Sequence, residues 1–165
     1  MSARVGNESH LQRQLRDLIC LAVVGDHVRW VLVKDDEFGD WLAQATGQWR
    51  GWAEQVAAQL VASEVAPDGR VRSLAKDIPL NWVPEGWLSG SAARHLIAER
   101  LTLVAESARH RHSQAKGADV ELLDRVAAGL EAQLRARRKA AAIHAERELR
   151  NRNAAVRAER RHANQ

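Results

Sequence analysis

The chain has 165 residues, 45% of them hydrophobic and 28% charged, so it is the size of one domain and can bury a core. Its longest apolar run, Leu18 to Val24, is much shorter than the roughly 20 residues of a membrane span, which argues against a membrane protein or membrane partner. Cys20 is the only cysteine, which excludes a disulfide framework and a zinc knot. Residues 1–9 lack the apolar core of a secretory signal, so we expect a cytoplasmic protein.

The net charge of +4 is unevenly distributed along the chain. Residues 135–165 contain ten Lys and Arg against three acids, a net charge of +7, whereas residues 1–134 contain 15 basic and 18 acidic residues, a net charge of −3. We therefore predict a folded domain over residues 1–134 and a basic C-terminal extension over residues 135–165 that binds a polyanion. The ten cationic residues are Arg135, Arg137, Arg138, Lys139, Arg147, Arg150, Arg152, Arg157, Arg160 and Arg161.

A first helix is predicted from Ser9 or His10 to about Val33. Gly25 interrupts its pattern at a cost of about 1 kcal/mol relative to alanine, which a long helix absorbs if the glycine allows close packing. The apolar positions that repeat at helical spacing are Leu11, Leu15, Leu18, Ile19, Ala22 and Val23.

A second helix follows, with Asp35 or Asp36 placed to cap it. Proline and glycine at residues 67–69 end it. Its apolar residues recur at steps of three and four, so they share one face that must be buried. They are Phe38, Leu42, Ala45, Trp49, Trp52, Val56 and Leu60.

The segment from residue 66 to residue 91 contains all three prolines of the chain. It is too long for a simple turn between antiparallel helices, so we predict a crossover connection with a short helix over residues 71–76. Trp82 and Trp87 lie in this segment, and we expect both to cover the end or side of a helical bundle.

Two further helices are predicted after the crossover. Ser91 caps the third, which runs to about Gln114, and Asp119 caps the fourth. High helix propensity and the absence of proline after Pro84 allow the fourth helix to continue toward Ala158. The apolar positions are Leu96 or Ile97, Leu101, Val104 and Ala108 in the third helix, and Leu122, Leu123, Val126, Leu130 and Leu134 in the fourth.

The predicted fold class is all-α, because no segment shows the period-two alternation of a β-strand. A short turn, a long crossover and a second short turn join four helices into an up-down-down-up bundle of the ferritin type. The basic extension continues the bundle as a C-terminal helix.

Several segments resemble the Dps proteins, the DNA-binding mini-ferritins of starved cells, and especially their actinobacterial type. They are Gly25 to Trp30, Phe38, the segment VAAQLVASEVAPDGR over residues 56–70, DVELL over residues 119–123 and GLEAQL over residues 129–134. The resemblance covers about residues 11–138. It implies a four-helix subunit, a hollow dodecamer, iron oxidation and storage, and DNA binding through a basic terminus.

The same resemblance implies an iron centre of two His, two Asp and one Glu, shared between two subunits, with donors suited to Fe(II). The family's His-Trp pair is replaced here by Arg29-Trp30, with His27 two positions earlier. The family's last Asp-x-x-x-Glu pair is represented by Glu54 and Ala58. At most His27 and Glu54 remain as metal ligands, and Arg29 places a permanent positive charge where a cation would bind.

The two remaining ligand positions fall in the second helix. They are Leu42 and Thr46 in one register, or Gly39 and Ala43 in the other, and neither pair supplies a ligand. We therefore expect iron oxidation to be weakened or lost. The residues themselves predict no cofactor, and iron enters only through the resemblance.

Two histidines of the RHRHS segment, His110 and His112, are a tempting metal site. Alternate residues on a helix point about 200° apart, so they cannot chelate one ion, and we expect surface histidines. Trp49 and Trp52 lie on the apolar stripe and are expected in the core or a subunit interface rather than against nucleobases.

The predicted function is that of a Dps-like, cage-forming protein of the cytoplasm and nucleoid. It binds and protects DNA without sequence specificity through the ten cationic residues of the extension, which suit phosphate contacts rather than base reading. Two alternatives are an active mini-ferritin that oxidises and stores iron through His27 and Glu54, and a ligand-poor structural subunit that co-assembles with an active Dps paralogue.

Overall fold

The structure of the chain is a computed structural model that describes residues 9–68 and 84–163. Its elements are α1 (His10–Val31), β1 (Leu32–Val33), α2 (Asp36–Ala62), β2 (Leu88–Ser89), α4 (Gly90–Gln114) and α5 (Asp119–Ala163). Contacts divide the chain into two compact units, Met1–Glu131 and Ala132–Gln165. We call them the bundle unit and the tail unit. The predicted domain boundary at residues 134 and 135 stays a prediction.

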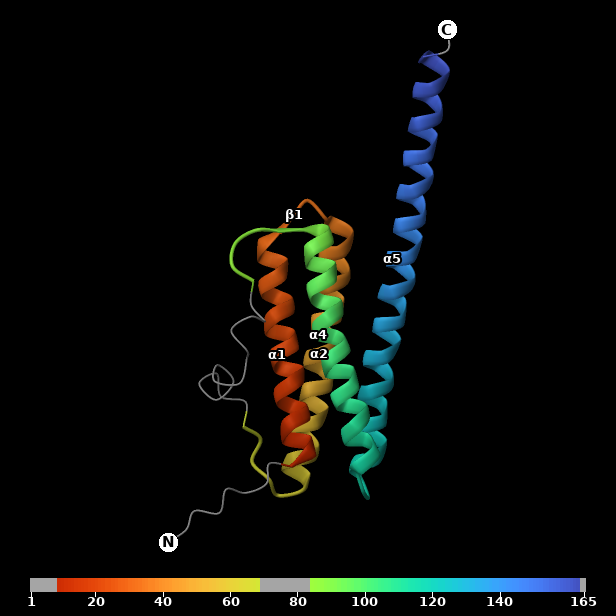
Figure 1. Cartoon of the computed structure of the whole chain (residues 1–165). Helices are drawn as coiled ribbons and strands as arrows, with labels where there is room; N and C mark the ends of the chain where they lie inside the picture. Colours follow the sequence, from red (N-terminus) through yellow and green to blue (C-terminus); the bar gives the residue numbers. More distant parts are fainter. Residues whose placement is uncertain (1–8, 69–83, 164–165) are drawn as a thin grey trace. The chain divides into compact units, whose positions relative to one another are not determined.

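The bundle unit is a four-helix bundle made by α1, α2, α4 and the first turns of α5 (Figure 1). A short connection joins α1 to α2, a long one joins α2 to α4, and a short turn joins α4 to α5. This order confirms the predicted all-α, ferritin-like topology with a long crossover.

Side-chain caps set where three of the helices begin. Ser9 accepts a hydrogen bond of 3.1 Å from the Gln12 amide at the start of α1. Asp35 accepts one of 3.1 Å from the Phe38 amide at the start of α2. The start of α1 near Ser9 or His10 and the capping of α2 by Asp35 agree with the predictions.

The start of α4 differs from the prediction. Ser89, rather than Ser91, caps the helix and accepts from the Ala92 amide at 3.2 Å. The cap lies two residues earlier because Leu88 and Ser89 form β2 and bring the chain into the helix from an extended conformation.

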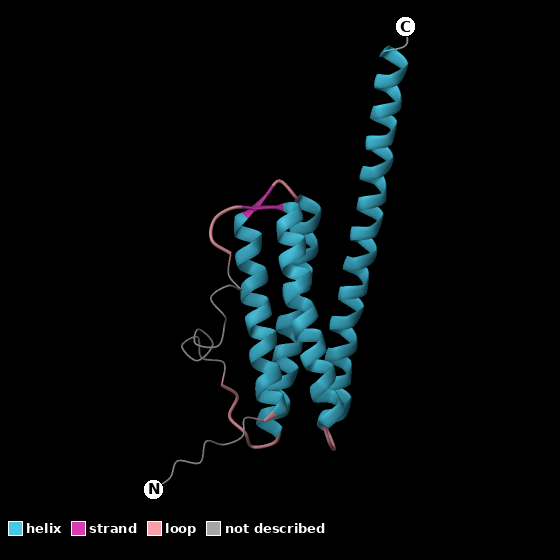
Figure 2. Ribbon diagram, in the orientation of Figure 1, coloured by secondary structure: helices cyan, strands magenta, loops and turns pink. Residues whose placement is uncertain are grey.

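A two-residue parallel bridge closes one end of the bundle (Figure 2). Leu32 pairs with Leu88 and Val33 pairs with Ser89, so α1 ends at Val31 rather than Val33. This short bridge was not predicted from the sequence, although the all-α fold class is confirmed. Two residues are too few to show a period-two pattern, so only the partner segment reveals the bridge.

The predicted stripe of α2 forms much of the core. Phe38, Leu42 and Trp49 are fully buried, as are several smaller residues around them. Trp52 is only partly buried, and its ring packs against α5, where a Cβ added to Gly129 would come within 2.3 Å of it. The other buried members of the stripe are Ala45, Val56 and Leu60.

Two apolar residues placed inside by the sequence lie on the surface instead. Val23 is 44% exposed and Trp87 is 76% exposed, so neither covers the bundle within one subunit. Trp87 points outward because the next residue, Leu88, turns toward the bundle and successive side chains of an extended segment alternate.

Trp82 and the predicted helix over residues 71–76 lie outside the described residues. In the described part, no helix is long and apolar enough to cross a membrane.

Gly25 allows α1 and α2 to approach closely, as the sequence suggested. A Cβ at this position would lie 2.5 Å from a Thr46 methyl group and 2.8 Å from the Trp49 ring, and both side chains are buried. We expect Gly25→Ala to lower the free energy of unfolding by about 1–3 kcal/mol, because overpacking outweighs the gain in helix propensity. Urea unfolding measures the change.

Gly47→Ala is the matched control in α2. Nothing lies within 4 Å of a Cβ at Gly47, so this variant should be as stable as the wild type or up to about 1 kcal/mol more stable. Equal effects of the two substitutions would contradict the close-packing role of Gly25.

Candidate nucleic-acid interface

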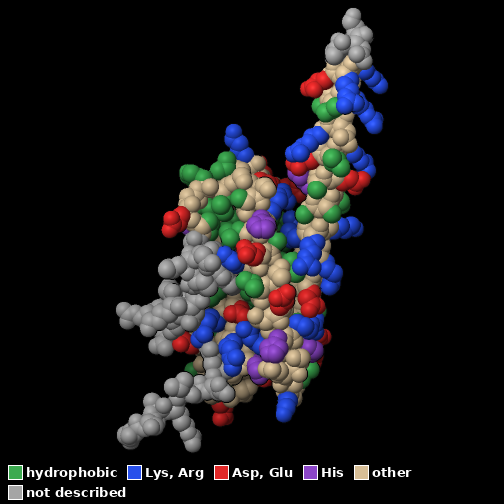
Figure 3. Space-filling model, viewed as in Figure 1, with side chains coloured by type: hydrophobic (Ala, Val, Ile, Leu, Met, Phe, Trp, Pro, Cys, Tyr) green, Lys and Arg blue, Asp and Glu red, His purple; other side chains and the backbone are tan. Residues whose placement is uncertain are grey.

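The tail unit is helical throughout its described part, because α5 continues to Ala163. Arginine and alanine are among the strongest helix formers, and the segment contains no proline. All side chains from residue 141 to residue 161 are exposed. Lys and Arg side chains are spread along it in Figure 3.

Few acids neutralise the cations of the tail unit. Arg150 forms an ion pair with Glu146 one turn earlier, and the His144 ring lies 3.6 Å from Glu148. Of the described tail residues, Arg147, Arg152, Arg157, Arg160 and Arg161 form no ion pair within the chain. The tail unit therefore presents guanidinium groups to solvent, and these bind phosphate oxygens as bidentate donors.

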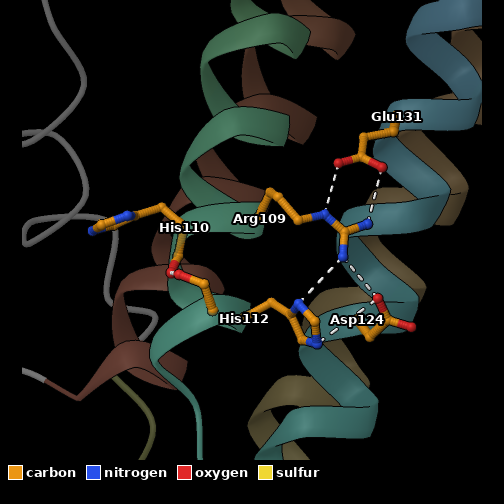
Figure 4. A network of polar contacts seen from close by, with 6 residues as sticks. Arg109, His110, His112, Asp124 and Glu131 are labelled. Carbon is orange, nitrogen blue, oxygen red and sulfur yellow. Dashed lines mark hydrogen bonds and ion pairs between the residues drawn. The ribbon is translucent and has the colours of Figure 1, made fainter.

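A polar network in the bundle unit joins α4 to the first part of α5 (Figure 4). Arg109 Nε and Nη2 donate to the two carboxylate oxygens of Glu131 at 2.8 and 2.9 Å. Its Nη1 donates to Asp124 Oδ1 at 2.8 Å and lies 3.2 Å from Nδ1 of His112. These bonds raise the pKa of the Arg109 guanidinium above its ordinary value and hold the pKa of Asp124 below its own. The arrangement ties the two helices together.

The two histidines of the RHRHS segment have different environments. His110 is exposed and lies 3.2 Å from the Gln114 amide nitrogen, which fits the predicted surface histidine. His112 is instead half-buried and takes part in the Arg109 network, on the opposite side from His110 (Figure 4). The sequence did not reveal this role, because its partners lie on another helix.

The lowered pKa of Asp124 predicts a loss of stability in acid. Because the hydrogen bond from Arg109 favours the carboxylate, the bond stabilises the fold above the ordinary pKa of 3.8 and is lost as the pH falls through the lowered folded value. We expect Asp124→Asn to reduce stability at neutral pH and to flatten the acid loss below pH 3.8. Urea midpoints of both proteins across this range test it, and parallel acid losses would contradict it.

The donors near the first predicted iron ligand are engaged within the chain. His27 Nε2 lies 3.1 Å from the Pro84 carbonyl oxygen, so this ring nitrogen is already used. Asp26, the neighbouring carboxylate, forms an ion pair with Arg50 of α2, and Arg29 lies 3.7 Å from it. Two guanidinium groups thus lie against the carboxylate of the residue that precedes His27.

The remaining ligand positions supply few side chains that could bind iron. Glu54 is exposed on α2, whereas Leu42 and Thr46 are fully buried in the bundle and Gly39 and Ala43 have no donor side chain. Across residues 9–68 and 84–163, no three His, Cys, Asp or Glu side chains are grouped to hold a metal ion. The donors present do not fit the iron centre that the resemblance implies, and the assignment of His27 and Glu54 stays a prediction.

Comparison with known proteins finds structural relatives. No protein-family profile and no curated protein sequence matches the chain. Among solved structures, it is similar to Dps92 from Deinococcus radiodurans with a TM-score of 0.71 and 19% identity, over 77% of this chain and 82% of the other. The chain has the fold of the Dps proteins.

Two structures from Mycobacterium smegmatis give the same result. A C-terminal deletion mutant of its Dps matches with a TM-score of 0.71 and 22% identity, over 78% of this chain and 93% of the other. A tetragonal crystal form of Dps from the same organism matches with a TM-score of 0.71 and 20% identity, over 84% of this chain and 93% of the other. Each comparison with a Dps structure thus covers most of both chains.

Proposed function

We propose that the chain is a Dps-like, cage-forming protein that binds and protects DNA without sequence specificity through its tail unit, in the cytoplasm at the nucleoid. The observation that carries the proposal is the exposed tail helix with ten Lys and Arg against three acids, in a chain whose bundle unit has the Dps fold. Each phosphate neutralised by such a side chain releases counterions, which favours binding to any DNA sequence.

Assembly into a homo-oligomer is supported by the surface of the bundle unit. Trp30 is 82% exposed and Trp87 is 76% exposed, and both lie next to the strands that close one end of the bundle. Large apolar side chains that stay exposed in one subunit are typical of surfaces covered by another. A dodecamer would combine twelve tails, each of modest affinity, into one strongly binding particle.

Electrophoretic mobility shift with duplex DNA tests the proposal. The full-length protein should shift DNA of unrelated sequences at similar concentrations, and a protein ending at Leu134 should shift none of them. Mass photometry of both proteins shows whether the assembly survives the truncation, so that lost binding is not mistaken for lost folding. Equal shifts from both proteins would show that the tail unit is not needed for DNA binding.

Iron oxidation is proposed to be weakened or lost, with Fe(II) as the substrate that the centre no longer holds. This rests on the engagement of His27 and Asp26 within the chain and on the arginines at positions 29 and 50. After anaerobic Fe(II) loading and addition of peroxide, we expect the near-ultraviolet absorbance of ferric product to rise at the protein-free rate.

The control for iron oxidation is a variant that lacks both remaining donors, His27→Ala with Glu54→Ala. If the wild type oxidises Fe(II) faster than buffer and this variant does not, the chain is an active mini-ferritin and the proposed loss is wrong.

A further inference from the structure

The cations of the tail helix, residues 132–163 of α5, are not spread evenly around it. An α-helix turns about 100° per residue, so the positions of side chains around it follow from their numbers. Lys139, Arg150 and Arg157 are separated by eleven and seven residues, close to three and two whole turns, and Arg161 follows one turn later. These four side chains lie within about 40° of one another.

Dividing the tail helix lengthwise around these four residues gives two unequal halves. The half centred on them, the basic half, contains seven Lys and Arg and one acid, a net charge of +6. The other half, the near-neutral half, contains three arginines and two acids, a net charge of +1. The basic half contains Arg135, Lys139, Glu146, Arg147, Arg150, Arg157, Arg160 and Arg161, and the near-neutral half contains Arg137, Arg138, Glu148, Arg152 and Glu159.

Acid placement strengthens this asymmetry. Glu148 and Glu159 both lie about opposite Lys139 around the helix, so they weaken only the near-neutral half. Glu146 is the one acid of the basic half, and it is paired with Arg150. The difference in net charge between the two halves therefore comes from the positions of both the cations and the acids.

We propose that duplex DNA contacts the tail helix through its basic half alone, an inference that rests on the DNA binding proposed above. A duplex is stiff and cannot wrap around a helix about 10–12 Å in diameter. At physiological salt the Debye length is about 8 Å, so cations on the far side of the helix are largely screened from the phosphates. The span from Lys139 to Arg161 is about 33 Å, close to one turn of B-DNA, so the basic half runs along several successive phosphates.

The test compares two full-length triple variants with the same change of charge. The first, Lys139→Gln, Arg157→Gln and Arg161→Gln, removes three cations of the basic half and leaves the Arg150–Glu146 pair intact. Glutamine has nearly the helix propensity of lysine and arginine, so the helix is retained, as circular dichroism would verify. We expect binding to a random duplex to weaken at least about tenfold, and the slope of log K against log salt to shrink by about 2 to 3.

The matched control is Arg137→Gln, Arg138→Gln and Arg152→Gln, which removes the three arginines of the near-neutral half. We expect its affinity to stay within about threefold of the wild type and its salt slope to change by less than about 1. Equal losses in both variants would overturn the one-sided contact while leaving the tail as the DNA-binding segment. If neither variant changes binding, both the one-sided contact and the proposed DNA binding through the tail are wrong.

Discussion

Raising the salt concentration from about 50 to about 200 mM is expected to weaken DNA binding by the full-length protein about 10³- to 10⁵-fold. This magnitude applies to a protein that neutralises six to ten phosphates, and the tail unit offers ten cations, seven of them on one half of its helix. Binding driven by counterion release falls as a power of the salt concentration, with an exponent of about 0.9 for each phosphate contacted. Fluorescence anisotropy with a labelled duplex over a salt series measures the slope.

The truncated protein that ends at Leu134 is the control for this salt dependence. Residues 1–134 have a net charge of −3, so the truncated protein should bind DNA weakly at every salt concentration. A second duplex of unrelated sequence should give the same slope for the full-length protein, because phosphate contacts carry no sequence information. A slope near zero for the full-length protein would rule out the tail cations as the source of affinity.

Helix positions were largely predictable because local chemistry determines them. Ser9 and Asp35 each precede an apolar periodic segment and have the side-chain oxygen that a helix start needs. The buried stripe of α2 follows from its spacing, and Gly25 follows from the need for close packing in an otherwise good helix. These features depend on residues within a few turns of one another.

Features that depend on distant partners were missed. The bridge between Leu32 and Leu88 joins segments more than 50 residues apart, and neither segment has a strand pattern of its own. Trp87 was expected to cover the bundle because it is large and apolar, but the bridge turns Leu88 inward and Trp87 outward. His112 was assigned to the surface because the sequence does not show that α5 supplies Asp124 beside Arg109.

The charge of the candidate interface was visible in the sequence, whereas its one-sidedness required knowledge that the segment is one regular helix. A disordered arm with the same composition would present all ten cations to DNA equally. Because α5 is helical to Ala163, residue numbers translate into directions around an axis, and seven of the ten cations face one way. The helical structure of the segment therefore determines on which side most of its cations lie, which its composition alone does not.

Replacing Asp35 with alanine is expected to lower the free energy of unfolding by about 2–3 kcal/mol, since it removes two interactions at once. The carboxylate caps α2 through the Phe38 amide, and it accepts from Arg94 Nε at 3.0 Å and Nη2 at 2.9 Å across to α4. The Arg94 guanidinium also lies 4.9 Å from the centre of the Phe38 ring. Gly90 leaves room for this contact, because a Cβ there would lie 2.3 Å from an Asp35 oxygen.

The two roles of Asp35 can be separated by a more conservative substitution and a double-mutant cycle. Asp35→Asn keeps a capping oxygen and loses the charge, so it should cost about 1 kcal/mol, with the rest of the alanine effect due to the cap. Asp35→Ala combined with Arg94→Ala should cost less than the sum of the two single variants, because each removes the same ion pair. Urea unfolding of the four proteins measures the coupling. Additive effects would show that Arg94 and Asp35 stabilise the end of the bundle independently, despite their bidentate contact.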